Sequence, residues 1–413
     1  MKKTIKHVFA LFCTTLALIP TAISVKADVN KTTPNVSDVK AQAITTANYC
    51  LTSDANLFSD LSTNSNFHTA SRDLLLANAV GADITTELNT YLETVKTLLN
   101  EDGSLILDSS NGYILANYAD LLDVLAIAKI DATNFEGHDI VSIFNEQMKA
   151  VTTSQFADSN YVNPYLLSGL YATTRSYHSL LSDYDQIYTN LTAAIKSITT
   201  NEGVQYYGFS ADNDFNVLTG MTALYNSDAE FAQKIDAIAT KHTNTTADSA
   251  GTIYTDPETG AVFFYGALNS DSTALSLGFV SEYGSSENSA IKYNALISNF
   301  KSQTTAGAFT YYGDDSIYSS RDALLGLSVY ISSLENTTHP FYVTPYINTV
   351  SNNETENDTV NETENNTETS AAPILDSAQT SDNLNLSLTV VLMAASLVTV
   401  ASLSINNKKN NVL

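Results

Sequence analysis

A glycine–aromatic string that recurs about every 50 residues constrains the fold of this chain more than any other feature. Its three strong copies are Gly203-Val-Gln-Tyr-Tyr-Gly208, Gly260-Ala-Val-Phe-Phe-Tyr-Gly266 and Gly307-Ala-Phe-Thr-Tyr-Tyr-Gly313. A weaker copy starts at Gly103-Ser-Leu, two periods before the first strong one. Repeats of this length indicate stacked supersecondary units, each too small to bury its own apolar face.

Two different kinds of apolar segment flank the strings. The preceding segment is amphipathic, as in Leu88, Tyr91, Leu92 and Val95 with i, i+3, i+4, i+7 spacing. The following segment is apolar nearly all round, as in 121–130, 274–280 and 323–331, which is typical of a fully buried helix. The half-buried helices are predicted to begin near residues 38, 84, 138, 185, 227 and 285, and the buried ones near 69, 115, 163, 214, 271 and 319.

Alternating half-buried and buried helices predict two concentric rings. The expected fold class is therefore all-α, an (α/α)6 toroid of about six helical hairpins over residues 38–345. An open α-solenoid is the alternative. Loops of about 15 residues around the strings disfavour the short-turn helical repeats.

The two ends of the chain predict export and anchoring. Residues 1–27 combine basic, apolar and small-residue parts in the order of a signal peptide, and a flexible segment is expected at 28–37. Residues 346–376 form an Asn/Thr/Glu-rich, disordered stalk. An apolar stretch at 384–405 is long enough for a transmembrane helix, and 406–413 is a basic cytoplasmic tail.

A degenerate sorting signal occupies residues 377–382, made of Ser377, Ala378, Gln379, Thr380 and Ser381 before an acid. Together with the apolar stretch and basic tail it resembles the Gram-positive sortase signal Leu-Pro-x-Thr-Gly. Thr380 keeps that pattern, whereas Ser377, Ala378 and Ser381 depart from it. The resemblance implies a surface protein with sortase and the membrane as partners, located extracellularly and anchored to cell wall or membrane at its C-terminus. A plain membrane anchor is the alternative.

The charge of the chain excludes one class of partner. All 44 Asp and Glu lie in residues 28–405, with 13 of the 19 Lys and Arg. So acidic a body repels phosphate backbones, and no nucleic-acid binding is expected. Cys13 lies in the predicted signal peptide, which leaves Cys50 without an intramolecular disulfide partner.

The Gly-x-Phe-like string before an apolar helix, and the segment Asp131-Ala-Thr-Asn-Phe-Glu-Gly-His-Asp-Ile140, resemble the prenyltransferase and squalene-cyclase-like α/α toroid family over residues 38–335. That family includes terpene cyclases, protein prenyltransferases, cobalamin carriers and surface proteins without assigned activity. The Asp, Cys and His that hold zinc in its prenyltransferases have no counterpart at metal-ligand spacing, and the acidic cyclase motifs are incomplete at Asp212-Asn-Asp214 and Asp314-Asp315. No catalytic residue, metal or cofactor is therefore expected.

A candidate ligand site follows from the position of acids and tyrosines just before buried helices, which in a toroid all begin at one end, its mouth. The set is Tyr207, Asp212, Asp214, Tyr265, Asp271, Tyr312, Asp314 and Asp315. The competing expectation is that these acids cap the helices and the tyrosines pack between repeats.

The expected function is that of a cell-surface binding protein with a non-catalytic, terpenoid-cyclase-like toroid and an unknown extracellular ligand, which is a glycan, a protein or a small molecule. One alternative is a carbohydrate-active hydrolase or lyase that uses acids at the mouth. The other is small-ligand capture, as in the cobalamin carriers of the family.

Overall fold

The computed structural model describes residues 29–107, 112–206, 208, 210–246, 255–264 and 267–348. The predicted signal peptide 1–27, the stalk beyond 348, the sorting signal 377–382, the apolar stretch 384–405 and the tail 406–413 lie outside these residues, as do Tyr207 and Tyr265. Among the described helices, none combines the length and apolar character needed to cross a membrane.

The described chain is mostly helical, which confirms the all-α class. Six helices within residues 29–348 have a half-exposed face: α2 (Val36–Ser53), α4 (Thr85–Lys96), α6 (Ile140–Lys149), α9 (Tyr184–Ile198), α12 (Ala229–Thr243) and α14 (Ser286–Phe300). Each is followed by a more deeply buried helix: α3 (Asn64–Val80), α5 (Tyr113–Ile127), α8 (Leu167–Ser176), α10 (Ala211–Leu218), α13 (Ser270–Tyr283) and α15 (Ile317–Glu335). Short pieces complete the helical part: α7 (Thr153–Phe156), α11 (Thr222–Ser227), η2 (Ala132–Asn134) and η3 (Pro164–Leu166).

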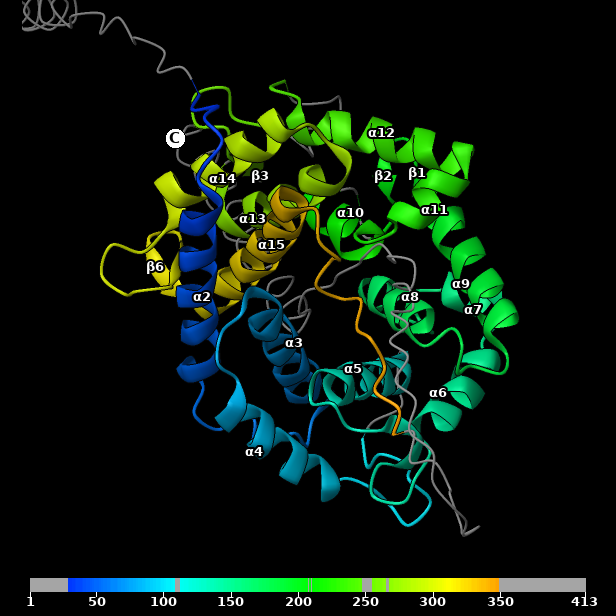
Figure 1. Cartoon of the computed structure of the whole chain (residues 1–413). Coiled ribbons are helices and arrows are strands. Elements are labelled where there is room, and N and C mark those ends of the chain that lie inside the picture. The colour runs from blue at the N-terminus through cyan, green and yellow to red at the C-terminus, as the bar shows by residue number, and fades with distance from the viewer. Residues whose placement is uncertain are drawn as a thin grey trace, which may run out of the picture.

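The six buried helices form a ring. In chain order α3, α5, α8, α10, α13 and α15 each contact the next, and α15 contacts α3 in turn. The half-exposed helices lie outside this cycle (Figure 1). The sequence pattern explains the division, because α4 buries only Tyr91 and Val95, whereas α5 is buried on every side from residue 115 to 126.

Hydrogen bonds between equivalent positions show that neighbouring ring helices begin on the same face. Side chains at or near successive helix starts pair as Asn64–Asn117, Tyr113–Asn163, Tyr165–Asn213 and Ser270–Ser319, which are 53, 50, 48 and 49 residues apart. The 50-residue period of the sequence is therefore also the separation between partners in space. We call the face where the ring helices begin the mouth.

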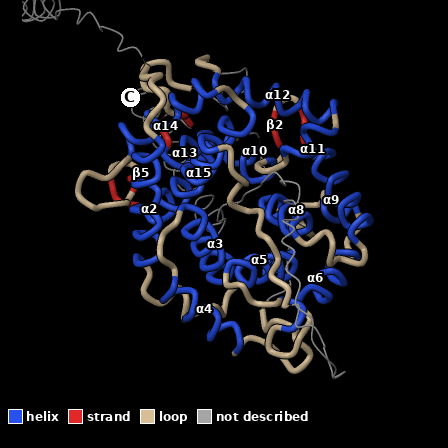
Figure 2. Tube along the Cα trace, viewed as in Figure 1, coloured by secondary structure: helices blue, strands red, loops and turns tan. Residues whose placement is uncertain are grey.

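The glycine–aromatic strings were expected to be loops, and this is wrong for the part that the structure describes. The second string gives β3 (Val262–Phe264), paired antiparallel with β4 (Ala267–Asn269), and the third gives β5 (Phe309–Tyr311), paired with β6 (Asp314–Ser316). The first string contributes β2 (Gly203–Val204), paired with β1 (Thr199–Thr200) (Figure 2). Aromatic and β-branched residues favour strands, which is why these short runs pair before the ring helices α10, α13 and α15 begin.

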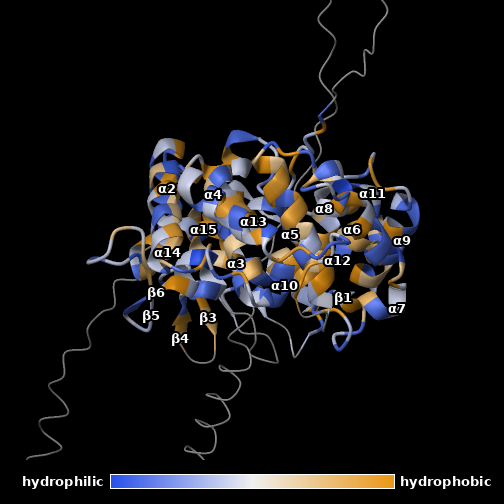
Figure 3. Ribbon diagram, turned by 90° about the horizontal axis from the view of Figure 1, so that it is seen from below, coloured by the Kyte–Doolittle hydropathy of each residue, from blue (hydrophilic) through white to orange (hydrophobic). Residues whose placement is uncertain are grey.

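The turn between β5 and β6 explains the tyrosine–glycine end of the string. Tyr312 has φ 50° and Gly313 has φ 94°, so both central residues are left-handed, as a two-residue type I′ hairpin requires. Seen edge-on, strands β3 to β6 lie together along one side of the ring (Figure 3). The strings therefore build the rim of the mouth.

A C-terminal strap, residues 337–348, covers the opposite face. It crosses in front of the ring in Figure 1, and its polar contacts lie at the ends of ring helices or just beyond them. They include His339 Nε2–Glu282 (2.6 Å), Arg175 Nη1 to Tyr342 hydroxyl (3.2 Å), Tyr342 hydroxyl to Gly220 carbonyl (3.2 Å), Val343 N–H to Ser176 Oγ (3.3 Å) and Asn348 N–H to Asp131 Oδ2 (2.8 Å). The first residues of the predicted stalk 346–376 thus belong to the ring.

The N-terminal segment predicted to be flexible, 28–37, is shorter in the structure, because α2 already begins at Val36. Residues 29–35 form no helix or strand. Asn294 Nδ2 on α14 donates to the carbonyls of Asn30 and Thr32 at 3.0 Å, and Lys31 pairs with Glu287. These contacts place the segment along α14.

Candidate functional site

Asp212 and Asp271 lie at the mouth, in the first turns of the adjoining ring helices α10 and α13. Neither caps its helix. The N-caps are Ser210 and Asn269, whose side chains accept from the N–H groups of Asn213 and Ser272. The expectation that these acids are helix caps is therefore wrong, because shorter or neutral residues already satisfy the helix ends. We call Asp212 and Asp271 the mouth pair.

The Asp212 carboxyl is partly exposed, but its Oδ1 is buried and has no hydrogen-bond partner. The hydroxyl of the fully buried Ser272 is a donor beside this carboxyl, although the two groups make no hydrogen bond of normal geometry. Burial raises the pKa of Asp212 to about 6; the Ser272 hydroxyl opposes this shift, and the charge of Asp271 adds to it. Asp212 is consequently a carboxyl whose ionised form is poorly stabilised by the protein.

Asp271 is better satisfied than Asp212 but also lacks a cation. Ser270 Oγ donates to its Oδ1 at 3.0 Å. Burial raises the pKa of Asp271, against the effect of the Ser319 and Ser270 hydroxyls. Tyr311 on β5 lies near both acids of the pair: burial first, then the Tyr312 ring and the two carboxylates, raise the pKa of its phenol. The mouth is thus lined by acceptors and hydroxyls.

Asp214 points away from the mouth into the core. It accepts from the Val204 N–H at 2.7 Å and meets His242 Nε2 at 3.4 Å, while His242 Nδ1 contacts Ser276 Oγ at 2.9 Å. Burial raises the pKa of Asp214 and lowers that of His242. All three side chains are completely buried, so this Asp–His–Ser line joins α10, α12 and α13 and is closed to substrates.

The remaining predicted site residues lie on the rim. Asp314 and Asp315 are exposed on β6, and hydroxyls of Ser302 and Thr305 lower the pKa of Asp315. Tyr312 is 74% exposed and meets Tyr311 edge to face at 4.5 Å between ring centroids. With Tyr207 and Tyr265 outside the described residues, the predicted acids that the structure brings together are Asp212 and Asp271.

Sequence reasoning missed a second polar group, deep between the ring helices, which we call the axial cluster: His68, Arg72, Asp73, Asp120 and Arg321. Asp120 receives His68 Nδ1 at 2.7 Å and Arg72 Nη2 at 3.3 Å, and Asp73 receives Arg321 Nη2 at 2.9 Å. These pairs join α3 to α5 and α15. The missed signal was a charged residue inside an otherwise apolar helix, which requires a buried partner.

The strap closes the axial cluster from the side opposite the mouth. The Phe341 ring is fully buried and lies 4.0 Å from the guanidinium carbon of Arg72, which is a cation–π contact. Nε and Nη1 of Arg72 have no hydrogen-bond partner. Asp123, one turn after Asp120, accepts from Thr173, and burial raises its pKa well above the ordinary value.

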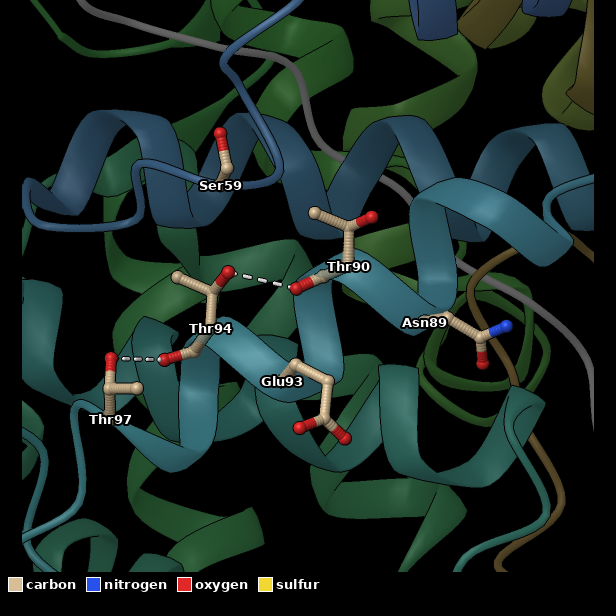
Figure 4. A pocket seen from close by; sticks show the side chains of 6 residues that line it. All are labelled: Ser59, Asn89, Thr90, Glu93, Thr94 and Thr97. Atoms are coloured by element: carbon tan, nitrogen blue, oxygen red, sulfur yellow. Dashed lines mark hydrogen bonds between the residues drawn. The ribbon is translucent and has the colours of Figure 1, made fainter.

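A depression of about 540 Å³ on the outer surface, beside α4, is a poor alternative site (Figure 4). The hydroxyls of Thr90, Thr94 and Thr97 that line it all donate to backbone carbonyls, two of these bonds being drawn in the figure. Its acid, Glu93, pairs with Lys96 at 2.9 Å. Its polar groups are therefore already used within the protein.

Two further findings concern metal binding and related proteins. Among the described residues, no group of three or more His, Cys, Asp or Glu is arranged to hold a metal ion. Comparison of the chain with family models, curated proteins and solved structures finds no match.

Proposed function

We propose that this chain is a surface-displayed binding protein of a Gram-positive bacterium, and that its (α/α)6 toroid receives an extracellular ligand at the mouth. Support for the toroid comes from the closed cycle of ring-helix contacts and from helix starts paired one repeat apart. Support for display comes from the signal-like N-terminus and the stalk, sorting-like and apolar segments at the C-terminus. Membrane or sortase attachment is part of the same proposal.

The observation that carries the proposal is the difference between the two faces of the ring. The strap seals one face, with Phe341 and His339 almost fully buried against the helix ends. The other face carries the mouth pair, whose two residues are both partly exposed, and the exposed ring of Tyr312 on its rim. A face that combines accessible carboxyls with an exposed aromatic ring is the part of the ring that an extracellular ligand can reach.

A binding array tests the proposal directly. Full-length chain is applied to glycans, peptides and small molecules, including corrinoids, beside the Asp212→Asn/Asp271→Asn double variant. A bound ligand that the double variant binds at least about tenfold more weakly supports the mouth as the site. Glu93→Gln is the matched control, since Glu93 is an exposed acid on the outer helix α4. Equal binding by the double variant would place the site elsewhere.

Carbohydrate cleavage is a second candidate, which one observation favours. Hydrolysis of a glycosidic bond needs one protonated and one ionised carboxyl across the substrate. Asp212, with its pKa of about 6, and its neighbour Asp271 supply two carboxyls with raised pKa values at one mouth. Release of reducing ends from a polysaccharide by the full-length chain, abolished by Asp212→Asn, would identify an enzyme; binding without product identifies a binding protein.

A further inference from the structure

We propose that the strap, residues 337–348, is a dissociable cover, which leaves and rejoins a ring that stays folded. Its release opens Arg72 of the axial cluster to solvent. This device goes beyond the proposed function and does not depend on it, because the strap lies on the face opposite the mouth. Three features of the described residues carry it: the way the strap is attached, the partners that remain after its release, and the bonding of Arg72.

The ring is complete without the strap. Contacts between α15 and α3 close the cycle of ring helices, and α15 ends at Glu335, before the strap begins. Residues 337–348 form no helix or strand, and only positions 339–341 among them are buried. A segment with so few buried groups belongs to the least stable part of a fold, and such parts open before the core does.

Both acids that hold the strap keep hydrogen-bond partners when it leaves. Glu282 accepts from the hydroxyl of Thr219 and from the Gly220 N–H, each at 2.7 Å. Asp131 binds the strap through Oδ2, while its Oδ1 accepts from the N–H and the hydroxyl of Thr133 at 2.9 and 2.7 Å. Release therefore orphans neither carboxylate, and the penalty for an unsatisfied buried group does not arise at these anchors.

The closed strap leaves Arg72 incompletely bonded. Its Nη2 meets Asp120, whereas Nε and Nη1 have no hydrogen-bond partner and the fully buried ring of Phe341 covers the guanidinium at 4.0 Å. Arg321, in the same cluster, binds Asp73 through both Nε and Nη2. Once Phe341 leaves, water can bond the N–H groups of Arg72, and this hydration offsets part of the apolar burial that is lost.

The strap thus has two states on one folded ring. Burial of Phe341 and its cation–π contact with Arg72 favour the closed state, whereas hydration of Arg72 favours the open one. Minor states of this kind are typically populated at about 0.1–10%. Arg72 should therefore react with a reagent in solution about 10- to 1,000-fold more slowly than it does when it is uncovered.

Modification of arginine by phenylglyoxal measures the opening, because the chain contains only three arginines, Arg72, Arg175 and Arg321. The full-length chain is treated below its unfolding transition, and mass spectrometry of its peptides follows each arginine. Phe341→Ala should raise the rate at Arg72 at least about tenfold, and Phe341→Leu should raise it less. Arg321 is the internal control, and its rate should stay within about twofold because its partner Asp73 does not contact the strap residue.

A disulfide tests the same motion with Phe341 kept. The Val343 N–H lies 3.3 Å from Ser176 Oγ, so cysteines in the double variant Ser176→Cys/Val343→Cys are expected to lie near enough to bond. The oxidised variant should react at Arg72 at least about tenfold more slowly than the reduced form of the same variant. Peptide mapping confirms the disulfide, and near-ultraviolet circular dichroism confirms that each variant is folded.

Three results would overturn the proposal. A rate at Arg72 that the disulfide leaves unchanged would mean that its exposure does not require the strap to open. Equal slowing of Arg72 and Arg321 would mean that the ring opens as a whole. The cover would be permanent if Arg72 of the unlocked chain reacted only where denaturant unfolds the ring, as followed by far-ultraviolet circular dichroism.

Discussion

The mouth pair and the axial cluster both place carboxylates inside one ring of helices, but they treat the charge in opposite ways. Asp120 in the axial cluster meets Arg72 and His68 from α3, so its charge is balanced within the chain. Asp212 at the mouth has the acid Asp271 and the Ser272 hydroxyl as neighbours, and neither of them is a cation. The difference teaches that a buried carboxylate with a cationic partner joins neighbouring helices, whereas one without a cation, such as Asp212 or the core residue Asp123, has a raised pKa.

The two regions also come from different parts of the chain. The axial cluster uses α3, α5 and α15, whereas the mouth pair uses α10 and α13. If the mouth binds the proposed ligand, stability and ligand binding depend on different repeats of the ring, and substitutions should separate them.

The largest effect is expected at the axial cluster. Asp120→Asn leaves Arg72 as a buried cation without its counter-ion, which typically lowers the free energy of unfolding by about 3–5 kcal/mol. Chemical denaturation followed by far-ultraviolet circular dichroism measures the loss. A loss below about 1 kcal/mol, the value of an exposed pair such as Lys96–Glu93, would remove the distinction between the axial pairs and surface pairs.

Phe341→Ala tests the axial cluster through the strap residue that covers Arg72. It removes a fully buried ring from Arg72, and such truncations cost about 3 kcal/mol or more. Phe341→Leu, which keeps most of the apolar volume but not the aromatic face, is the matched control and should lose less. Ligand binding at the mouth should remain unchanged in both variants at a temperature where they are folded. A binding loss equal to that of the mouth variants would connect the two regions.

Asp212→Asn should raise the free energy of unfolding, by up to about 3 kcal/mol at neutral pH, whereas the two axial variants lower it. The folded pKa of Asp212 is raised to about 6 from an ordinary value of 3.8, so its ionised form costs stability above about pH 6. Between those values the folded state takes up a proton, and the advantage of the variant should shrink as the pH falls toward 4. Denaturant titrations at several pH values measure this; a destabilised variant would mean that Asp212 has a structural partner.

The smallest effect is expected at the rim. Asp314→Asn changes an exposed acid on β6 and should alter the free energy of unfolding by no more than about 0.5 kcal/mol. Thermal unfolding of the variant beside Asp212→Asn checks the contrast. If both acids behaved alike, the burial of Asp212 Oδ1 would have no energetic consequence.

Much of the helical layout was predictable from periodicity. The half-exposed helices begin within two residues of the predicted positions, for example at Val36 against 38 and at Ser286 against 285. The ring helices were placed less well, α3 beginning at Asn64 against 69, since a helix that is apolar all round has no periodic edge to mark its start. The strands were missed because runs as short as Phe309–Tyr311 carry a weak signal in an otherwise helical chain.

The positions of the two mouth acids were predictable from the sequence, whereas the directions of the acidic side chains and the axial cluster were not. Asp212 and Asp271 could be found because they precede apolar helices that share one end. What the sequence could not give was which way each acid points: Asp214, two residues from Asp212, lies in the core against His242. The axial cluster depends on pairs such as Asp73–Arg321, which are 248 residues apart, and no local pattern links such residues.

The strap determines on which face of the ring residue 348 lies, and so which face is nearer to an attachment there. Its last described residue, Asn348, is bound beside Asp131 beyond the end of α5, on the face opposite the mouth. A tether attached there would turn the mouth outward, away from the surface that anchors it. The strap contacts successive helix ends. A force on its C-terminal end would therefore break the contact with Asp131 first and the contact with Glu282 last. Such a force would detach the strap from the axial cluster before it separated the ring helices from one another.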